Sequence, residues 1–302
     1  KSNLPVTVPS PLERVRERLM KNIYAIGVGL IGGSLAKDIK RNNPDMIIHG
    51  ISRKDATLDE ALSLKLIDKK ATLEDIKHAD LVIVSIPVDA TVKLLPIILD
   101  LIPDTGLVVD AGSTKEAICK AVENHPKRRN FLAMHPIAGT EHSGPSAAIS
   151  GLFEGKTNIV CEVEKTTFKL QEKALKLFTG IGMRIRYMNP EAHDKHIAYM
   201  SHLSHISSFM LGKTVIDKEK NERDIFDMAG SGFASTVRLA KSSPEMWTPI
   251  FKQNKTNVIE TLEEYINNLN HFKELMKQDD FEAIYNEMKN TNYIKDILNG
   301  MI

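Results

Sequence analysis

Short apolar runs alternate with amphipathic stretches along the chain as far as residue 187. An apolar run bounded by polar residues or glycine predicts a buried strand, and apolar positions three and four apart predict a helix covering it. The predicted strands are residues 23–26, 46–51, 81–86, 107–110, 131–134, 158–162 and 184–187. The predicted helices between them include residues 56–64, 88–101, 115–123 and 166–179. This alternation predicts an α/β fold with a doubly wound sheet.

The pattern changes at Asn189-Pro190. Residues 192–215, 249–277 and 279–298 show helical periodicity with almost no strand signal, so we expect an all-helical domain over residues 189–302. Residues 1–19 contain three prolines and a charged stretch, and Met20 directly precedes the first predicted strand. We interpret residues 1–19 as a leader or an added segment, and we expect the first domain to span residues 20–188.

A glycine motif joins the first predicted strand to a helix. Gly27, Gly29 and Gly32 have the spacing G-x-G-x-x-G, which in this context is typical of a Rossmann dinucleotide-binding domain. Gly27 would form the tight turn, Gly29 would admit a pyrophosphate, and Gly32 would let helix and strand pack closely. Leu30 and Ile31 lie at the helix N-terminus, which would face the phosphates. A glycine-rich turn without a ligand is the alternative.

The end of the second predicted strand bears on the choice of cofactor. NAD-specific sites usually place a carboxylate about 20 residues after the glycines, where it binds the adenosine ribose. This chain has Ser52, Arg53 and Lys54 there instead. A hydroxyl and two cations suit a 2′-phosphate, so the sequence favours NADP, with NAD as the alternative cofactor. Ordinary solvated loop charges would give the same sequence.

Composition excludes several classes of partner. The formal net charge of the 302 residues is +1, so no strong field favours nucleic acid or an anionic membrane. No apolar run reaches the roughly 18 residues of a membrane span. Cys119 and Cys161 are the chain's two cysteines and suggest no disulfide framework. We therefore expect a cytoplasmic protein whose partner is a small molecule.

Three polar segments carry candidate chemistry. Residues 109–115 and 135–141 follow the fourth and fifth predicted strands, at the edge that lines the ligand crevice in open α/β sheets. On the first long helix of the second domain, His202 and His205 are three residues apart and share one face. Together with His135, they suggest an anionic substrate between the domains. Metal binding is disfavoured, because no cysteine or acidic pair completes a ligand set.

These motifs together resemble the prephenate/arogenate dehydrogenase family of tyrosine biosynthesis. The resemblance rests on the order of the glycine motif, Asp110-x-Gly-Ser113-x-Lys115, residues 135–141 (HPIAGTE), residues 201–205 (SHLSH), residues 230–233 (GSGF), Arg238 and residues 244–247 (PEMW). It implies a Rossmann domain followed by a helical domain that forms a homodimer. It also implies the oxidative decarboxylation of a cyclohexadienyl substrate.

The same resemblance implies roles for individual residues. His135 matches the catalytic histidine, and Ser113 matches the hydroxyl that orients it and the substrate. The residues that match positions lining or binding the substrate are Thr140, Glu141, His202, His205 and Arg238. Since His205 and Arg238 are donors or cations, they favour the dianionic prephenate over arogenate, which carries an ammonium group. Arg238 alone would also be explained as a surface ion-pair residue.

Two other functions fit part of the sequence. A β-hydroxyacid dehydrogenase would share the Rossmann-plus-helical organisation but would ordinarily use a lysine where this chain offers histidines. A nonenzymatic NADP-binding sensor would be expected to lack the polar residues around the nicotinamide. This chain retains Ser113, His135, His202 and His205.

Overall fold

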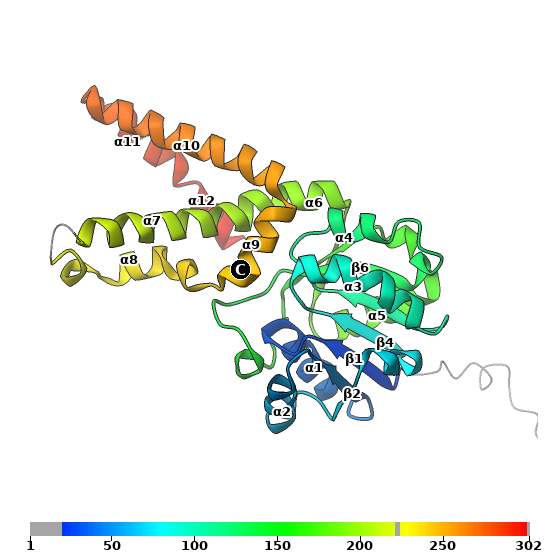
Figure 1. The fold of residues 1–302 in the computed structure, drawn as a ribbon. Helices are drawn as coiled ribbons and strands as arrows, with labels where there is room; N and C mark the ends of the chain where they lie inside the picture. Colours follow the sequence, from blue (N-terminus) through cyan, green and yellow to red (C-terminus); the bar gives the residue numbers. More distant parts are fainter. Residues whose placement is uncertain (1–19, 221–223, 301–302) are drawn as a thin grey trace, which may run out of the picture.

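The computed structural model describes residues 20–220 and 224–300, so the interpretation of residues 1–19 lies outside the described part of the chain. These residues form an α/β domain joined to an extended array of helices (Figure 1). The strands are β1 (Asn22–Ile26), β2 (Ile47–Ile51), β3 (Lys69–Lys70), β4 (Leu81–Val84), β5 (Leu107–Asp110), β6 (Phe131–Pro136), β7 (Thr157–Cys161) and β8 (Arg184–Met188). They form one eight-stranded sheet in the order β3-β2-β1-β4-β5-β6-β7-β8.

Helices cover both faces of this sheet, as the doubly wound prediction requires. They are α1 (Leu30–Asn42), α2 (Asp55–Ser63), α3 (Val88–Leu101), α4 (Glu116–Ala121) and α5 (Phe168–Gly180). Successive residues of each central strand enter opposite cores. Ile23 and Ala25 belong to one buried cluster, whereas Tyr24 and Ile26 belong to the other. The fold class is confirmed, with the addition that β7 runs antiparallel to β6.

The order of the strands in the sheet reverses at β1. This strand pairs with β2 on one side and with β4 on the other. Ligands of open α/β sheets bind at such a point, beyond the carboxyl ends of the strands. β4 and β5 are buried along their whole length, which explains their uninterrupted apolar sequences. The predicted strand over residues 81–86 ends two residues early, at Val84.

The remaining helices are α6 (Pro190–Ile197), α7 (Leu203–Glu219), α8 (Ser231–Thr236), α9 (Pro244–Gln253), α10 (Lys255–Lys277), α11 (Phe281–Thr291) and α12 (Ile294–Asn299). A π-helical turn, Ala198–His202, joins α6 to α7 without a break, as the prediction over residues 192–215 implies. The prediction of one helix over residues 249–277 is wrong, because Asn254 separates α9 from α10. The prediction over residues 279–298 is likewise divided, into α11 and α12.

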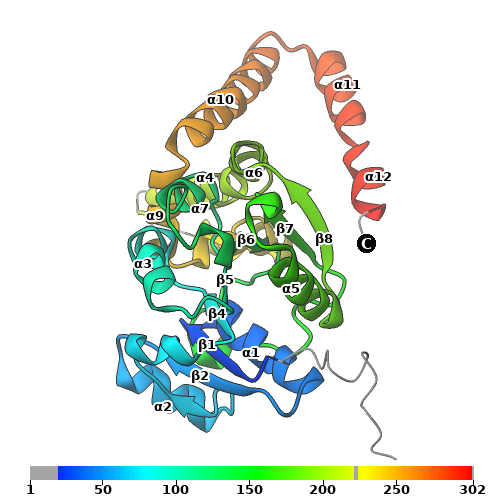
Figure 2. The same cartoon turned by 90° about the vertical axis from the view of Figure 1, so that its right-hand side faces the viewer.

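The helical array is anchored to the α/β domain through α9. Trp247 and Ile250 of α9 are buried in the same cluster as the strand residues Val82 and Val84. Beyond α9, α10 projects away from the sheet, and α11 and α12 turn back at an angle to it (Figure 2). No helix of the described residues has the length and apolar character needed to cross a membrane.

Candidate active site

The turn after β1 has the geometry that the glycine motif predicts. Gly27 has a φ of +87°, in the region that favours glycine. A Cβ at this position would lie 2.4 Å from the carbonyl oxygen of Ser85. A Cβ at Gly32 would lie 2.0 Å from the carbonyl oxygen of Gly27, so α1 packs against the turn at a distance that only glycine permits. Both positions therefore need glycine for the turn to exist.

The N-terminus of α1 is open to an anion. Gly29 precedes the helix, no side chain caps it, and no acidic residue stands in the first turn. A Cβ on Gly29 would meet only Gly144 N, at 3.9 Å, so the space above this residue is free. Unpaired amides at a helix N-terminus bind phosphate well. The residues of this turn therefore fit the pyrophosphate of a dinucleotide.

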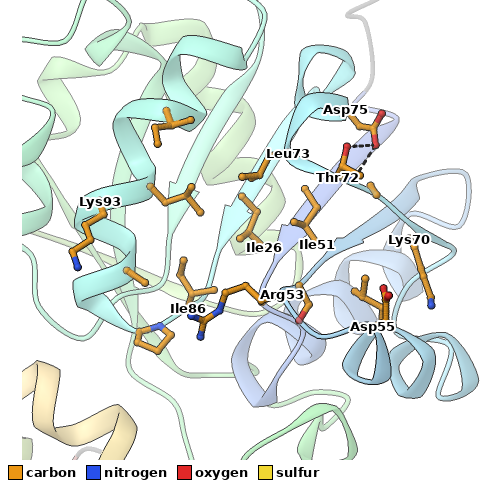
Figure 3. Close-up of a pocket in the computed structure, with 18 residues that line it drawn as sticks. Ile26, Ile51, Arg53, Asp55, Lys70, Thr72, Leu73, Asp75, Ile86 and Lys93 are labelled. Atoms are coloured by element: carbon orange, nitrogen blue, oxygen red, sulfur yellow. Dashed lines mark hydrogen bonds between the residues drawn. The ribbon is translucent and has the colours of Figure 1, made fainter.

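A cleft of about 830 Å³ lies beside this turn, at the carboxyl ends of β1 and β2 and against α3 (Figure 3). Ser52 and Arg53 line it, and Arg53 extends across it towards Ile86. Lys54 is exposed, directly precedes α2 and is not among the lining residues. Two of the three residues predicted to select the cofactor are therefore at the cleft.

A second cationic residue that the sequence analysis did not identify, Lys70, also lines the cleft. Lys70 belongs to β3, a strand too short and too polar for the hydrophobic pattern to reveal. Its Nζ lies 2.7 Å from a carboxylate oxygen of Asp59 and so is already paired. Lys93 of α3 also lines the cleft, and Arg53 is the cation that extends across it from the end of β2.

A buried ion pair fixes the ends of β5 and β6. Lys115 and Asp110 are both fully buried and in contact through Nζ and Oδ2. Lys115 Nζ also donates to the carbonyl of Met134, at 2.7 Å. The Asp110 carboxylate accepts hydrogen bonds from Gly112 N (2.9 Å) and Met134 N (3.2 Å). These bonds fix the backbone directly before His135.

His135 contacts a histidine that the sequence analysis missed. Its Nδ1 lies 2.8 Å from Nε2 of His193, on α6, and Nδ1 of His193 lies 2.7 Å from Oδ1 of Asp194. Asp194 also accepts hydrogen bonds from the backbone N of Lys115 (2.7 Å) and Glu116 (3.0 Å). The contact therefore links the end of β6 to α6 and to the start of α4.

These buried histidines are held neutral. Burial lowers the pKa of His135 well below 6.5, and the charges of His193, Lys115 and His202 add to this effect. Burial also lowers the pKa of His193, although Asp194 opposes the shift. A neutral imidazole at the end of β6 can act as a proton acceptor.

His202 presents a buried donor. Its Nδ1 accepts from Nδ2 of Asn254 (3.1 Å), whose second amide hydrogen goes to the backbone carbonyl of Asp194 (2.7 Å). The orientation of the Asn254 amide is set by Asn257 Nδ2, which donates to its Oδ1 at 2.7 Å. His202 must therefore carry its proton on Nε2, which is buried and has no hydrogen-bond partner among the described residues. Burial lowers its pKa to about 4.

His205 is half-buried and lies against Trp247. Its ring stacks on the indole, with 3.5 Å between ring centroids and 28° between planes. Its Nδ1 donates to the carbonyl of Ser201, at 2.9 Å. Trp247 also contacts His202 edge-on, at 5.8 Å between centroids. The two histidines of the predicted pair therefore meet the same aromatic side chain.

The remaining predicted residues lie around the loop after β6. Glu141 and Arg238 form an ion pair at 2.8 Å, with half of the Arg238 side chain exposed. The pKa of Glu141 is lowered first by a hydrogen bond from its own backbone N–H and then by the hydrogen bond from the Arg238 guanidinium. Thr140 is half-buried and accepts from His142 N, at 3.2 Å. Ser113 is half-buried, and no hydrogen bond joins it to His135 within the described chain; Nδ1 of His135 is instead occupied by His193.

The fold and site define a two-domain oxidoreductase that uses a nicotinamide dinucleotide. Its Rossmann turn is open to phosphate, and a neutral histidine stands at the end of a central strand. Within the described residues, no cluster of histidine, cysteine or acidic side chains is arranged to hold a metal ion.

The chain belongs to the prephenate dehydrogenase family. The family model for the prephenate dehydrogenase nucleotide-binding domain matches residues 35–187, and that for the dimerization domain matches residues 189–290. The family assignment confirms the resemblance found in the sequence and leaves a β-hydroxyacid dehydrogenase without support.

Individual relatives agree with this assignment. The chain is 31% identical to a prephenate dehydrogenase of Bacillus subtilis, over 92% of this chain and 76% of the relative. It is similar to the crystal structure of a prephenate dehydrogenase from A. aeolicus in complex with hydroxyphenyl propionate and NAD+ (TM-score 0.84, 31% identity, 94% and 100% coverage). It is also similar to a Synechocystis arogenate dehydrogenase (TM-score 0.73, 25% identity, 92% and 99% coverage).

Proposed function

We propose that this protein converts prephenate to 4-hydroxyphenylpyruvate by oxidative decarboxylation. The observation that carries the proposal is His135, a buried neutral imidazole near the end of β6 that contacts His193 at the start of the helical domain. The substrate has a C4 hydroxyl and a C1 carboxylate on a cyclohexadiene ring. His135 accepts the hydroxyl proton as the C4 hydride leaves, and loss of carbon dioxide from C1 then gives the phenol.

The cofactor is held by the turn between β1 and α1. When bound, the nicotinamide supplies the hydride acceptor. Gly27, Gly29 and Gly32, with the amides at Leu30 and Ile31, hold the pyrophosphate.

The substrate lies between the two domains in this proposal. His202 offers its Nε2–H as a donor, Arg238 supplies donors for the carboxylates, and His205, whose Nδ1–H is used by Ser201, lines the site beside them. Ser113, Thr140 and Glu141 line the site. The domain division that we propose, residues 20–188 and 189–302, places the cofactor on one side and the carboxylate donors on the other.

We expect prephenate to be preferred over arogenate. Arogenate carries an ammonium where prephenate carries a keto group, and a cation beside the Arg238 guanidinium is unfavourable. The test is kcat/KM for each substrate, followed through the reduced nicotinamide. A higher kcat/KM for arogenate would reverse the substrate assignment, and no turnover of either substrate would refute the proposed function. The likeness to an arogenate dehydrogenase makes arogenate the alternative.

We further propose NADP as the cofactor, with NAD as the alternative. Arg53 extends across the cleft from the position at which NAD-specific sites usually carry a carboxylate, and the two carboxylates that line the cleft, Asp55 and Asp75, are the ground for NAD as the alternative. An Arg53→Asp variant should lose NADP efficiency by about 1–3 kcal/mol of transition-state binding, roughly 5- to 150-fold, while NAD efficiency is maintained or rises. Lys54→Asp, which changes charge equally but outside the cleft, is the matched control. Wild-type kcat/KM that is at least as high with NAD would contradict this prediction.

The helical domain matches a dimerization domain, and we propose that the protein is a homodimer. Large apolar side chains are exposed on α10, which projects away from the α/β domain, and on α11, which turns back from its end (Figure 2). They are Ile266, Leu269, Phe272, Phe281, Tyr285 and Met288. Light scattering at micromolar concentration should give twice the chain mass. Leu269→Glu should weaken the dimer, whereas Lys176→Glu on the exposed side of α5 should leave it unchanged; a monomeric wild type would contradict the proposal.

A further inference from the structure

We propose that His193 and Asp194 are positioning residues that fix the tautomer of His135 and make its Nε2 the base. This inference rests on the proposed function, because it assigns how that base is prepared. The three side chains form a continuous series across the junction of the α/β and helical domains, with contacts of 2.8 Å and 2.7 Å. The first contact joins two elements, because His135 lies near the end of β6 and His193 lies on α6, whereas His193 and Asp194 are consecutive residues of α6.

The direction of the hydrogen bonds follows from Asp194. Both of its oxygens accept backbone N–H groups, Oδ1 from Lys115 and Oδ2 from Glu116, so Oδ1 is an acceptor towards His193 as well. The Nδ1 of His193, 2.7 Å away, must therefore carry the proton in that bond. A neutral His193 then has a lone pair at Nε2, and the 2.8 Å contact requires that His135 donate from its Nδ1.

As a result, Nε2 of His135 carries no proton. A neutral imidazole has one protonated nitrogen, so a proton fixed on Nδ1 leaves the lone pair on Nε2. That atom forms none of the hydrogen bonds within the described residues and is the one available to a substrate hydroxyl. When the hydroxyl proton moves to Nε2, the positive charge on His135 is stabilised through His193 and the carboxylate of Asp194.

Other groups nearby do not serve this purpose. The Lys115 ammonium faces the site but is paired with Asp110, and as a cation it disfavours charge on His135. His202 is fixed by Asn254 and also disfavours that charge. Asp194 is thus the negative group that the hydrogen bonds connect to His135.

Substitutions at His193 distinguish a role in positioning His135 from a merely structural role. His193→Leu removes both hydrogen bonds, and kcat should fall by about 100-fold or more while KM for prephenate stays within about 3-fold. His193→Gln offers an acceptor and a donor and should restore kcat to within about 10-fold of the wild type. His196→Leu, on the exposed side of the same helix, is the matched control and should leave both parameters unchanged.

The tautomer itself provides a readout that does not depend on activity. In protein labelled with [15N]histidine, two-bond 1H–15N correlations distinguish the Nδ1–H from the Nε2–H form. Wild type and His193→Gln should show His135 as Nδ1–H, and His193→Leu should lose that preference. His135 as Nε2–H in the wild type, or an unchanged kcat in His193→Leu, would overturn the inference. If His193→Leu does not fold, the wild-type tautomer alone decides it. Absence of prephenate turnover would refute the proposed function but leave the tautomer measurement valid.

Discussion

Replacing His135 by asparagine should reduce kcat by roughly two to four orders of magnitude, the range associated with loss of a general base. The side chain is buried at the end of β6 and contacts His193, not the dinucleotide cleft. Asparagine is similar in size and keeps a donor for His193, so folding should survive. NADP binding, measured by fluorescence titration, should change little, which would separate the loss of chemistry from a loss of cofactor.

The pH dependence of the wild type gives an independent check on His135. Activity requires its neutral form, and burial lowers its pKa well below 6.5. The kcat/KM, which reports the free enzyme, should therefore be retained as the pH falls through 6.5 and decline only well below it. The exposed His78→Asn serves as a control with the same substitution and should leave rate and profile unchanged. A near-normal kcat in His135→Asn at neutral pH would exclude His135 as the base.

The α/β domain was readable from sequence because its strands are buried on both faces. β4 and β5 have no polar position to obscure them, and the turn after β1 needs glycine for steric reasons at Gly27 and Gly32. β3 was missed because it has two residues, both lysine and both exposed. Hydrophobic periodicity carries no information about a strand that buries no side chain.

The break between α9 and α10 was missed for a different reason. Phe251 and Ile250 lie seven and eight residues before Val258, which is a helical spacing, so the pattern predicts one helix across the polar residues 252–257. Asn254 is buried because its side chain holds His202 and the carbonyl of Asp194. Its backbone leaves the helical conformation, with φ −101° and ψ 27°. The requirement that bends the chain here comes from residues more than 50 positions away, which no local pattern reveals.

The candidate site could be predicted only in part, again because some of its residues act through contacts with distant parts of the chain. His135, His202 and His205 stand in motifs that the sequence makes visible, whereas His193 and Asp194 follow the helix start at Asn189-Pro190 in no recognised pattern. A signal was present: an adjacent histidine and aspartate in the first helix after the last strand, where two domains must meet. Its meaning depends on the contact with His135, 58 residues earlier.

Replacing Lys115 by methionine should destabilise the protein by about 3–5 kcal/mol, the usual cost of removing one partner of a buried ion pair. Lys115 and Asp110 are completely buried, so the variant would leave the Asp110 carboxylate without a compensating charge. It would also remove the bond from Nζ to the carbonyl of Met134, which precedes His135. The measurement is the free energy of unfolding from urea titration.

The double variant Asp110→Asn/Lys115→Met distinguishes charge from packing. Asparagine has one acceptor oxygen and so retains a bond to one of the two backbone N–H groups, Gly112 or Met134, but it carries no charge. The double variant should therefore be more stable than Lys115→Met alone, because no unpaired ion remains in the interior. Lys120→Met, exposed on the same helix, is the matched control and should change stability by less than about 0.5 kcal/mol. If the free energy of unfolding of Lys115→Met were within about 1 kcal/mol of the wild-type value, the ion pair would not stabilise the strand ends next to His135.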